Sequence, residues 1–439
     1  MQHTRVRRGM VATVGAVLLA LLAVTPPVLA AGGWGPTERV VPLQRQVYGV
    51  DSVIDRAGTT TAVWSRKDGD ARQIMAARRP AAGEWSTPLV VENVGRVAGE
   101  PRVAADGHGR LTVVWSTMRS VQAVQRLPWG RWTDPVTIGT APRGYAPAYL
   151  GLASNADGLT LATWELMDDD QDSTYAPSRV VAVLRQPTGS WGRPTVLTPR
   201  SQRSYRPQPA VTADGEAMLV WDSETRASGT VMFSSRWPGA GWSMARPLSP
   251  PSTHAAAPQL AVNAHGAVVV AWVAVGRFDR VQAVRRPSDG RWSPPVSLST
   301  TAGDVWWHDV ASAANGASTV GWALRDGSVH AADWKPGPGW GRPVTVAPRG
   351  SVFYELELLR NGRGDTLATW TSVSGGDHPV VTAYRPMGGA WQAPARVSQP
   401  SGDAFGAAAL GPFGRAGVVW VNGNVGLTGP VYARFHQPG

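Results

Sequence analysis

The chain has 439 residues, no cysteine and a formal net charge of +11, from 42 basic and 31 acidic residues. Without cysteine it can have neither a disulfide framework nor a lipid attached at a cysteine, so a hydrophobic core must hold it, which this length can supply. The basic residues are scattered, and no helix-turn-helix, zinc-finger or RNA-binding signature is present. We therefore expect no nucleic-acid partner.

Residues 1–30 have the three parts of a secretory signal peptide. Three arginines within the first eight residues precede an apolar run from Met10 to Val24, and the small-residue sequence Val28–Ala30 ends the segment. The apolar run is short for a membrane span, and two prolines follow it. We therefore expect cleavage after Ala30 and a secreted protein with no membrane span.

The rest of the chain repeats. A run rich in valine and alanine that ends in tryptophan recurs eight times, and so does a second tryptophan that follows a glycine-rich turn. The first series is Trp64, Trp115, Trp164, Trp221, Trp272, Trp322, Trp370 and Trp420. The second is Trp34, Trp85, Trp132, Trp191, Trp242, Trp292, Trp340 and Trp391. Most intervals are 47 to 51 residues, and a longer one between Trp132 and Trp191 marks an insertion.

Each repeat predicts four short strands. In the second repeat these are residues 101–105, 111–115, 121–124 and a strand from Trp132 to Ile138. The turn after the first strand nearly always closes on glycine, as a hairpin that needs a positive φ requires. Four-stranded units of this period are typical of propeller blades. A string of small sandwich domains is the alternative, but one unit has too few strands and no linkers separate pairs. The sequence thus predicts an all-β protein, a single eight-bladed β-propeller over residues 31–439.

The two ends of the chain predict how the ring closes. Residues 34–43 form a fourth strand with no blade before it, and the last repeat stops at a third strand, 431–435. We expect the N-terminal strand to complete the last blade, with Val40 and Val41 pairing against Val431–Ala433. Six repeats carry proline three residues after the second tryptophan, which places this strand at the outer edge because proline cannot donate to a ladder.

The turn Arg286–Trp292, followed by Ser-Pro-Pro-Val, resembles the turn between the third and fourth strands of sialidase-type propellers, which carry BNR repeats. The Asp box of that family, Ser-x-Asp-x-Gly-x-Thr-Trp, is degenerate here: Thr188–Trp191 and Gly388–Trp391 keep only glycine and tryptophan. The chain is also similar to secreted repeat proteins of actinobacteria. The family's arginine in a Phe/Tyr-Arg-Ile-Pro context has no clean counterpart, since Tyr384-Arg385-Pro386 belongs to an Arg-Pro or Arg-x-Pro pattern found in nearly every repeat. The resemblance implies the propeller fold and supplies no activity.

Residues that depart from the repeat are the candidate site residues. The residue after the second-strand tryptophan is small or apolar in most repeats, but two adjacent repeats carry Glu165 and Asp222 there. Neighbouring blades would bring them to one side of the channel mouth. Such a pair can act as acid and nucleophile in glycoside hydrolysis. The alternative is two solvated loop-base carboxylates paired with Arg179 or Arg226.

The insertion is acidic. Alternating aspartates can chelate a hard cation, so Asp168, Asp170 and Asp172 are candidate calcium ligands. The EF-hand pattern is absent, because its glycine and its final glutamate are missing. A flexible acidic loop is the alternative, and no other cofactor is expected.

Arginine and aromatic residues gather in the loops that enter the first strands, on the face where propeller ligands usually bind. Aromatic faces stack on sugar rings and guanidinium groups bind carboxylates and hydroxyls, so this set suits an acidic glycan. The alternative is that the paired tryptophans plug the channel. The predicted ligand-binding residues are Arg143, Tyr145, Arg203, Tyr205, Trp306, Trp307, His308 and Tyr354.

Because these loops differ between repeats, we expect one asymmetric site rather than one site per blade. The sequence favours a monomeric, secreted, non-catalytic propeller that binds a carbohydrate or another cell-envelope polymer. The alternatives are a sialidase-like glycoside hydrolase that uses Glu165 and Asp222, and a scaffold for protein partners.

Overall fold

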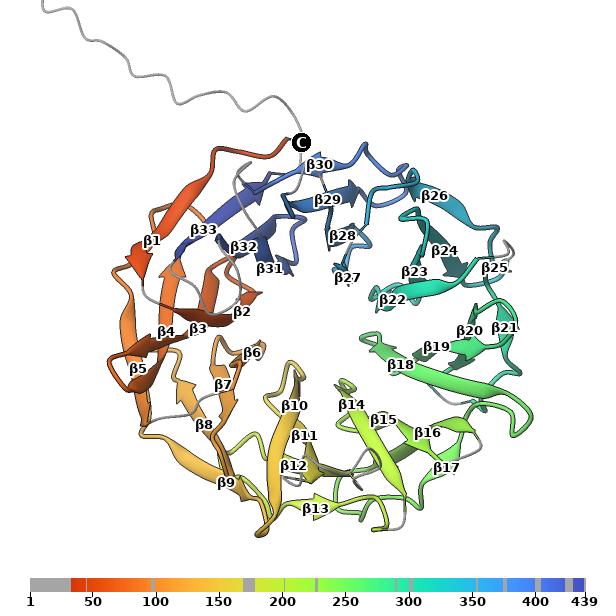
Figure 1. Cartoon of the computed structure of the whole chain (residues 1–439), viewed down its shortest axis with the longest axis horizontal. Coiled ribbons are helices and arrows are strands. Elements are labelled where there is room, and N and C mark those ends of the chain that lie inside the picture. The colour runs from red at the N-terminus through yellow and green to blue at the C-terminus, as the bar shows by residue number, and fades with distance from the viewer. Residues whose placement is uncertain are drawn as a thin grey trace, which may run out of the picture.

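The computed structural model describes residues 33–44, 46–95, 99–168, 178–200, 202–225, 228–288, 290–299, 303–352, 354–373, 377–398, 404–422 and 429–437. These residues form eight antiparallel sheets arranged as a ring around a central channel, and none of them is helical (Figure 1). The predicted eight-bladed propeller is confirmed. Among the described residues, accordingly, there is no helix that could cross a membrane.

The blades follow one another along the chain. Blade 1 contains β2 (Val47–Ile54), β3 (Thr60–Asp68), β4 (Ala71–Arg79) and β5 (Leu89–Gly95). Blade 2 contains β6 (Arg102–Ala105), β7 (Leu111–Ser116), β8 (Ser120–Arg126) and β9 (Val136–Thr140). Blade 3 contains β10 (Tyr145–Ser154), β11 (Thr160–Asp168), β12 (Arg179–Arg185) and β13 (Thr195–Val196). Blade 4 contains β14 (Arg203–Val211), β15 (Ala217–Glu224), β16 (Gly229–Arg236) and β17 (Arg246–Pro247).

The second half of the ring repeats this order. Blade 5 contains β18 (His254–Val262), β19 (Val268–Val275), β20 (Arg280–Arg286) and β21 (Val296–Ser297). Blade 6 contains β22 (Val305–Ser312), β23 (Ser318–Leu324), β24 (Val329–Lys335) and a fourth strand in two pieces, β25 (Gly339–Trp340) and β26 (Val344–Ala347). Blade 7 contains β27 (Tyr354–Arg360), β28 (Thr366–Thr371), β29 (Val380–Arg385) and β30 (Ala395–Arg396). Blade 8 contains β31 (Ala404–Leu410), β32 (Ala416–Asn422), β33 (Gly429–His436) and β1 (Glu38–Gln44).

The core lies between the blades. The second strands are almost wholly buried because both of their faces meet a neighbouring sheet. Their repeated tryptophans fill this space: one cluster joins Val269 and Ala271 of β19 to Trp322 of β23 in the next blade. The glycine that closes the turn after each first strand has a positive φ in all eight blades, which confirms why glycine recurs there.

The fourth strands begin later than predicted. Trp132 makes only an isolated bridge to Arg126, and β9 starts at Val136, directly after Pro135. In five of the six repeats that carry this proline, the outer strand starts at the residue that follows it. In blade 6 the longer piece, β26, does so, and the short β25 pairs before the proline. Proline has no N–H to donate, so it interrupts the ladder at this point.

Pairing between the two ends closes the ring as predicted. β1 lies antiparallel to β33, with Arg39 opposite Tyr432 and Val41 opposite Val431. In Figure 1 the two strands lie side by side as the outer half of blade 8.

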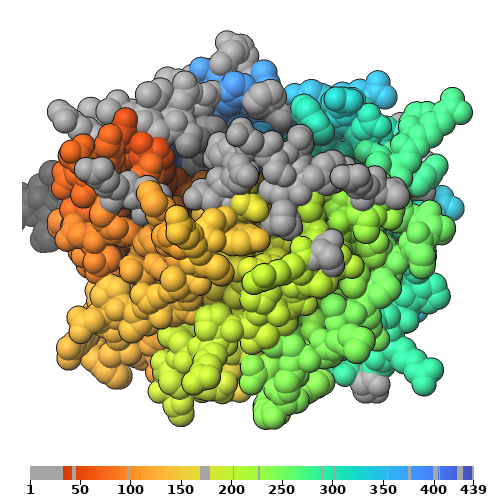
Figure 2. All heavy atoms as spheres, turned by 60° about the horizontal axis from the view of Figure 1, so that its bottom comes forward, coloured from red at the N-terminus to blue at the C-terminus, as the bar shows by residue number. Residues whose placement is uncertain are grey.

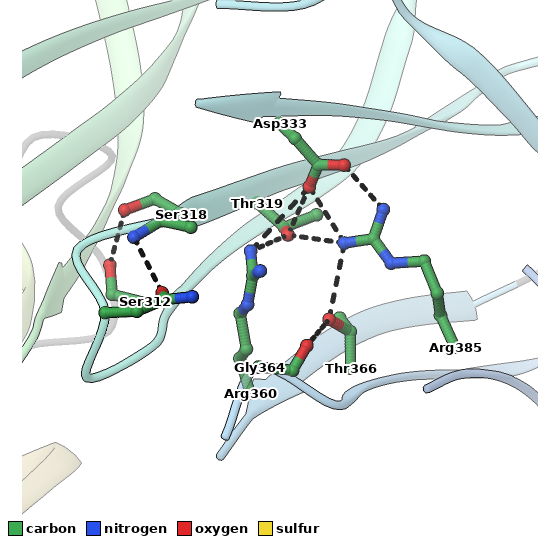
Figure 3. Close-up of polar contacts among 10 residues, drawn as sticks. Ser312, Ser318, Thr319, Asp333, Arg360, Gly364, Thr366 and Arg385 are labelled. Carbon is green, nitrogen blue, oxygen red and sulfur yellow. Dashed lines mark hydrogen bonds and ion pairs between the residues drawn. The ribbon is translucent and has the colours of Figure 1, made fainter. Parts of the chain in front are cut away.

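The repeated arginine before each proline joins neighbouring blades. Arg385 of blade 7 binds both carboxylate oxygens of Asp333 in blade 6, at 2.6 and 2.8 Å, and donates to Thr319 at 2.9 Å (Figure 3). Arg360 donates to the same threonine at 2.8 Å. Arg286 likewise pairs with Glu216 of the preceding blade. These contacts give the Arg-Pro pattern a structural role.

Candidate functional site

The first strands of all eight blades line a central cavity of about 700 Å³. One position of each strand, three residues before its end, faces this cavity. In blade order these residues are Asp51, Arg102, Gly151, Gln208, Gln259, Asp309, Glu357 and Ala407. The set is asymmetric: carboxylates come from blades 6, 7 and 1, whereas blades 4 and 5 supply amides.

The three carboxylates also connect adjacent first strands. Asp309 accepts a hydrogen bond from the backbone N–H of Leu358 at 2.7 Å, and Glu357 accepts one from Ala408 at 3.2 Å. Asp51 accepts one from Val103 at 2.8 Å. Each carboxylate is therefore fixed against the next blade at the wall of the cavity.

Burial makes these groups weak acids. It raises the pKa of Asp309 to about 7 and that of Glu357 to about 8, and the Asp309 charge adds to the second effect. It also raises the pKa of Asp51 and of Glu355, another residue of the cavity wall. Near neutral pH the acidic wall can therefore both donate and accept hydrogen bonds.

Bulges turn further side chains toward the cavity. Tyr149, Arg206 and Glu355 have positive φ values of 47°, 55° and 53°, at points where the register of β10, β14 and β27 shifts. All three line the cavity. A left-handed conformation is unfavourable for a side chain with a Cβ, so the fold maintains strained positions around the channel.

Glu165 and Asp222 lie beneath these bulges. Glu165 accepts from the backbone N–H of Arg206 at 3.3 Å, and Asp222 accepts from the N–H of Ala257, another left-handed bulge residue, at 2.8 Å. Both are buried, so the alternative that they are solvated is wrong. Arg226 lies outside the described residues.

The environment of Asp222 is unusual. Its Oδ2 has no hydrogen-bond partner among the described residues. Burial raises its pKa to about 7, and the nearby Glu165 charge contributes. The pKa of Glu165 is also raised by burial. In the structure the charge of Glu165 thus acts on Asp222, and each of the two predicted carboxylates accepts a hydrogen bond from the next blade.

Arg203 and Tyr205 adjoin this pair. Tyr205 lies opposite Asp222 in the strand register and donates from its hydroxyl to Glu224 at 3.0 Å. Arg203 pairs with Glu224 at 3.5 Å, and its guanidinium carbon lies 5.7 Å from the centre of the Tyr205 ring. Arg203 is therefore already engaged by a carboxylate of its own blade.

The other predicted ligand-binding residues are spread around the ring. Arg143 is exposed in the turn before β10, and Tyr145 stacks under Arg179, whose guanidinium carbon is 5.0 Å from the ring centre. Trp307 lines the cavity and meets Tyr354 edge-on at 5.1 Å.

The two other residues of this loop point in different directions. Trp306 is partly exposed, and His308 is buried at the cavity wall. Burial lowers the pKa of His308 to about 4, so its imidazole is neutral. Of the paired tryptophans, Trp307 forms part of the cavity wall, whereas Trp306 does not line the cavity.

The calcium prediction is not tested. Asp168 ends β11, whereas Asp170 and Asp172 lie outside the described residues. Within the part of the chain that the structure describes, no group of three or more histidine or acidic side chains could hold a metal ion.

Asp51, Asp309 and Glu357 lie neither in the loops nor directly after a repeated tryptophan, so those sequence patterns do not indicate them. A signal for them exists. Each of the eight cavity-facing residues stands seven positions before the glycine that closes the following turn. Aligning the repeats on that glycine would have shown the three carboxylates.

No protein-family model matches the sequence, and no curated protein matches it. Among solved structures the fold is similar to the BP39L lectin from Burkholderia pseudomallei, with 16% identity and a TM-score of 0.55 over 81% of this chain and 99% of that chain. It is also similar to an α-L-arabinanase from Penicillium chrysogenum, with 12% identity and a TM-score of 0.43 over 81% of this chain and 99% of that one. The NanB sialidase from Streptococcus pneumoniae has 10% identity and a TM-score of 0.41 over 90% of this chain and 68% of its own. At these identities the similarity concerns the propeller fold alone.

Proposed function

We propose that this chain is a secreted, non-catalytic propeller that binds a carbohydrate of the cell envelope in its central channel. The observation that carries the proposal is the asymmetric cavity wall, with Asp51, Asp309 and Glu357 on one side and Gln208 and Gln259 on another. Carboxyl and amide groups supply both donors and acceptors, which a ring of hydroxyl groups requires. Aromatic residues at the same wall offer surface for the C–H faces of a sugar.

The channel favours a neutral or amine-bearing sugar over an anionic one. Among the described residues, five carboxylic side chains line the cavity, whereas only Arg102 and Arg206 supply positive charge there. Arg102 lies 3.6 Å from the Glu100 carboxylate, which reduces its availability. An anionic ligand would meet like charge wherever these carboxyl groups ionise and gains little from the two arginines, so the acidic glycan expected from the loop arginines is disfavoured.

A solved lectin of similar fold supports the class of ligand. The BP39L lectin shares the propeller architecture of this chain. The fold by itself does not determine function, so the wall of the cavity remains the basis of the proposal.

Glycoside hydrolysis is the second candidate, because Asp222 combines a raised pKa with an unpartnered buried oxygen next to Glu165. A carboxyl group that keeps its proton near neutral pH can act as a general acid. Against this role, both carboxylates are buried and each already binds a backbone N–H.

The test is a glycan array and a hydrolysis screen on the wild type and two double variants. Asp51→Asn/Glu357→Gln alters the channel wall, and Glu165→Gln/Asp222→Asn alters the second candidate pair. Glu84→Gln, at an exposed position, serves as the control. The proposal expects binding without turnover, weakened by the channel variant alone. Turnover abolished by Glu165→Gln/Asp222→Asn would establish the hydrolase instead, and neither binding nor turnover would favour a protein scaffold.

A further inference from the structure

A second pocket opens at the other end of the strands, between blades 3 and 4. The turns after the first strands of these blades supply Asp157 and Asp214, and the turns after their third strands supply Gln186 and Trp237. The pocket has a volume of about 330 Å³. The channel wall is formed by the N-terminal and middle parts of the first strands, so the two cavities share no lining residue. Figure 2 shows the yellow-green and green turns of these two blades side by side along its lower edge.

An exposed tryptophan forms one side of this pocket. The Trp237 side chain is 46% exposed, which is unusual in a chain whose repeated tryptophans are mostly buried or partly buried. Its turn is closed by a hydrogen bond from the N–H of Ala240 to the Trp237 carbonyl at 3.0 Å. Pro238 packs on Gly215, where a Cβ would come within 3.0 Å of the proline ring. The tryptophan therefore stands on a rigid turn.

The remaining wall is apolar at its base and polar at its rim. Leu159 and Leu184 are buried beneath the opening, and Pro187 belongs to the neighbouring turn. That turn is fixed by Arg110 of the preceding blade, which donates to the Pro187 carbonyl at 3.1 Å. The base is thus a preformed apolar surface that spans two blades.

The rim carries hydrogen-bonding groups of several kinds. Asp157 is exposed, Asp214 accepts a hydrogen bond from Thr212 through one oxygen, and Gln186 and Arg236 stand beside them. Small-ligand sites combine such an apolar base with a few polar groups that fix orientation. The two carboxylates of facing turns, one amide and one guanidinium supply both acceptors and donors. This mixed set suits the hydroxyl groups of a sugar ring better than a ligand with a single charge.

We infer that this pocket binds one pyranose unit of a neutral glycan, with the Trp237 indole against the C–H face of the ring. The site lies at the opposite end of the strands from the channel and does not depend on the channel function proposed above. A protein with a sugar site at each end can hold two segments of an envelope polymer at once, and the second contact then gains from a high local concentration.

The test uses saturation-transfer NMR with methyl glycosides of galactose, fucose and glucose as probes. Trp237→Ala removes the stacking surface, and Trp237→Phe retains an aromatic ring. Trp129→Ala is the matched control, because Trp129 is 74% exposed on the corresponding turn of blade 2 and lies outside the pocket. Both positions are exposed, and melting curves verify that each of the three variants folds.

We expect Trp237→Ala to weaken binding of at least one glycoside tenfold or more, Trp237→Phe to restore part of it, and Trp129→Ala to leave it unchanged. The same glycoside should still bind to Asp51→Asn/Glu357→Gln, which separates this site from the channel. Equal binding by Trp237→Ala and the wild type would overturn the inference, as would the absence of transfer to any glycoside. If the channel variant loses array binding while Trp237→Ala binds every glycoside as the wild type does, the proposed function stands and this second site is refuted.

Discussion

The ion pair between blades 6 and 7 allows a quantitative test of what holds the ring together. Arg385→Ala removes a guanidinium that binds both oxygens of Asp333, at 2.6 and 2.8 Å. The side chains of Arg385 and Asp333 are only 10% and 23% exposed. Removal of one partner of a buried pair costs ~3–5 kcal/mol, because the other charge stays buried. Since Asp333 is partly exposed and still contacts Arg360 and Thr319, we expect the lower end, about 3 kcal/mol.

The expected change is measurable by thermal unfolding. Unfolding entropy is about 2.1 cal/mol/K per residue, so for about 400 residues a loss of ~3 kcal/mol lowers the Tm by roughly 3–4 °C. The matched control is Arg349→Ala, which breaks a 2.9 Å pair with Asp326 whose arginine side chain is 84% exposed. Exposed pairs contribute about 0–1 kcal/mol. Equal shifts for the two variants would refute the claim that the buried pair stabilises the contact between blades.

The same pair predicts a pH dependence. Burial acts to raise the pKa of Asp333, but the hydrogen bonds and the charge of Arg385 outweigh it and hold the pKa below its ordinary value. A depressed carboxyl pKa stabilises the fold above the pKa of the unfolded chain, and this contribution is lost as the pH falls through the folded value. The difference in Tm between the wild type and Arg385→Ala should therefore narrow below about pH 4. A constant difference from pH 7 to pH 3 would contradict this assignment.

Three further variants test other parts of the structure. Burial raises the pKa of Glu357 to about 8, so the folded state keeps a proton that the unfolded state releases, and stability falls as the pH rises from about 5 to 8. Burial lowers the pKa of His308, so this residue has the opposite effect: stability falls as the pH drops below about 6.5, the ordinary pKa of histidine. Glu357→Gln should raise the Tm at pH 9 by at least ~2 °C, because each unit of pKa shift corresponds to about 1.4 kcal/mol. An unchanged Tm in thermal scans at pH 9 would count against the raised pKa of Glu357. Val41→Asp buries a charge in the pairing that closes the ring, and should cost more than ~3 kcal/mol in urea unfolding; wild-type stability would show that closure contributes little. Gly139→Ala would drive a Cβ into the Trp164 ring and should cost about 1–3 kcal/mol, whereas Gly241→Ala, which meets no atom, should be neutral in the same assay.

The fold could be predicted because the sequence pattern of one blade occurs eight times along the chain. The buried tryptophan of each second strand and the glycine of each turn reflect a local requirement, and their period follows from the size of one blade. The closing strand was predictable from the incomplete first and last repeats. The start of the outer strand was not, because Trp132 lies beside β8 without extending its ladder, and only Pro135 marks where pairing can begin.

The site was predicted less well for a physical reason. Glu165 and Asp222 stood out as departures from the repeat, but sequence alone does not show that each one binds a backbone N–H of the next blade. Whether a carboxylate at the end of a strand is solvated or buried depends on how adjacent blades bulge. Asp51, Asp309 and Glu357 belong to strands whose inward positions differ from blade to blade, so only an alignment of the repeats reveals them as a set.

Binding of a sugar in the central channel can be measured most directly by isothermal titration calorimetry. The ligand is the glycan that the wild type binds most tightly on the array, and the comparison is Asp51→Asn/Glu357→Gln, with Glu84→Gln as the control. Loss of two hydrogen-bonding carboxylates predicts at least a tenfold weaker Kd for the channel variant and an unchanged Kd for the control, since tenfold corresponds to ~1.4 kcal/mol. Equal affinities for the wild type and the channel variant, with both proteins folded, would contradict a binding site in the channel.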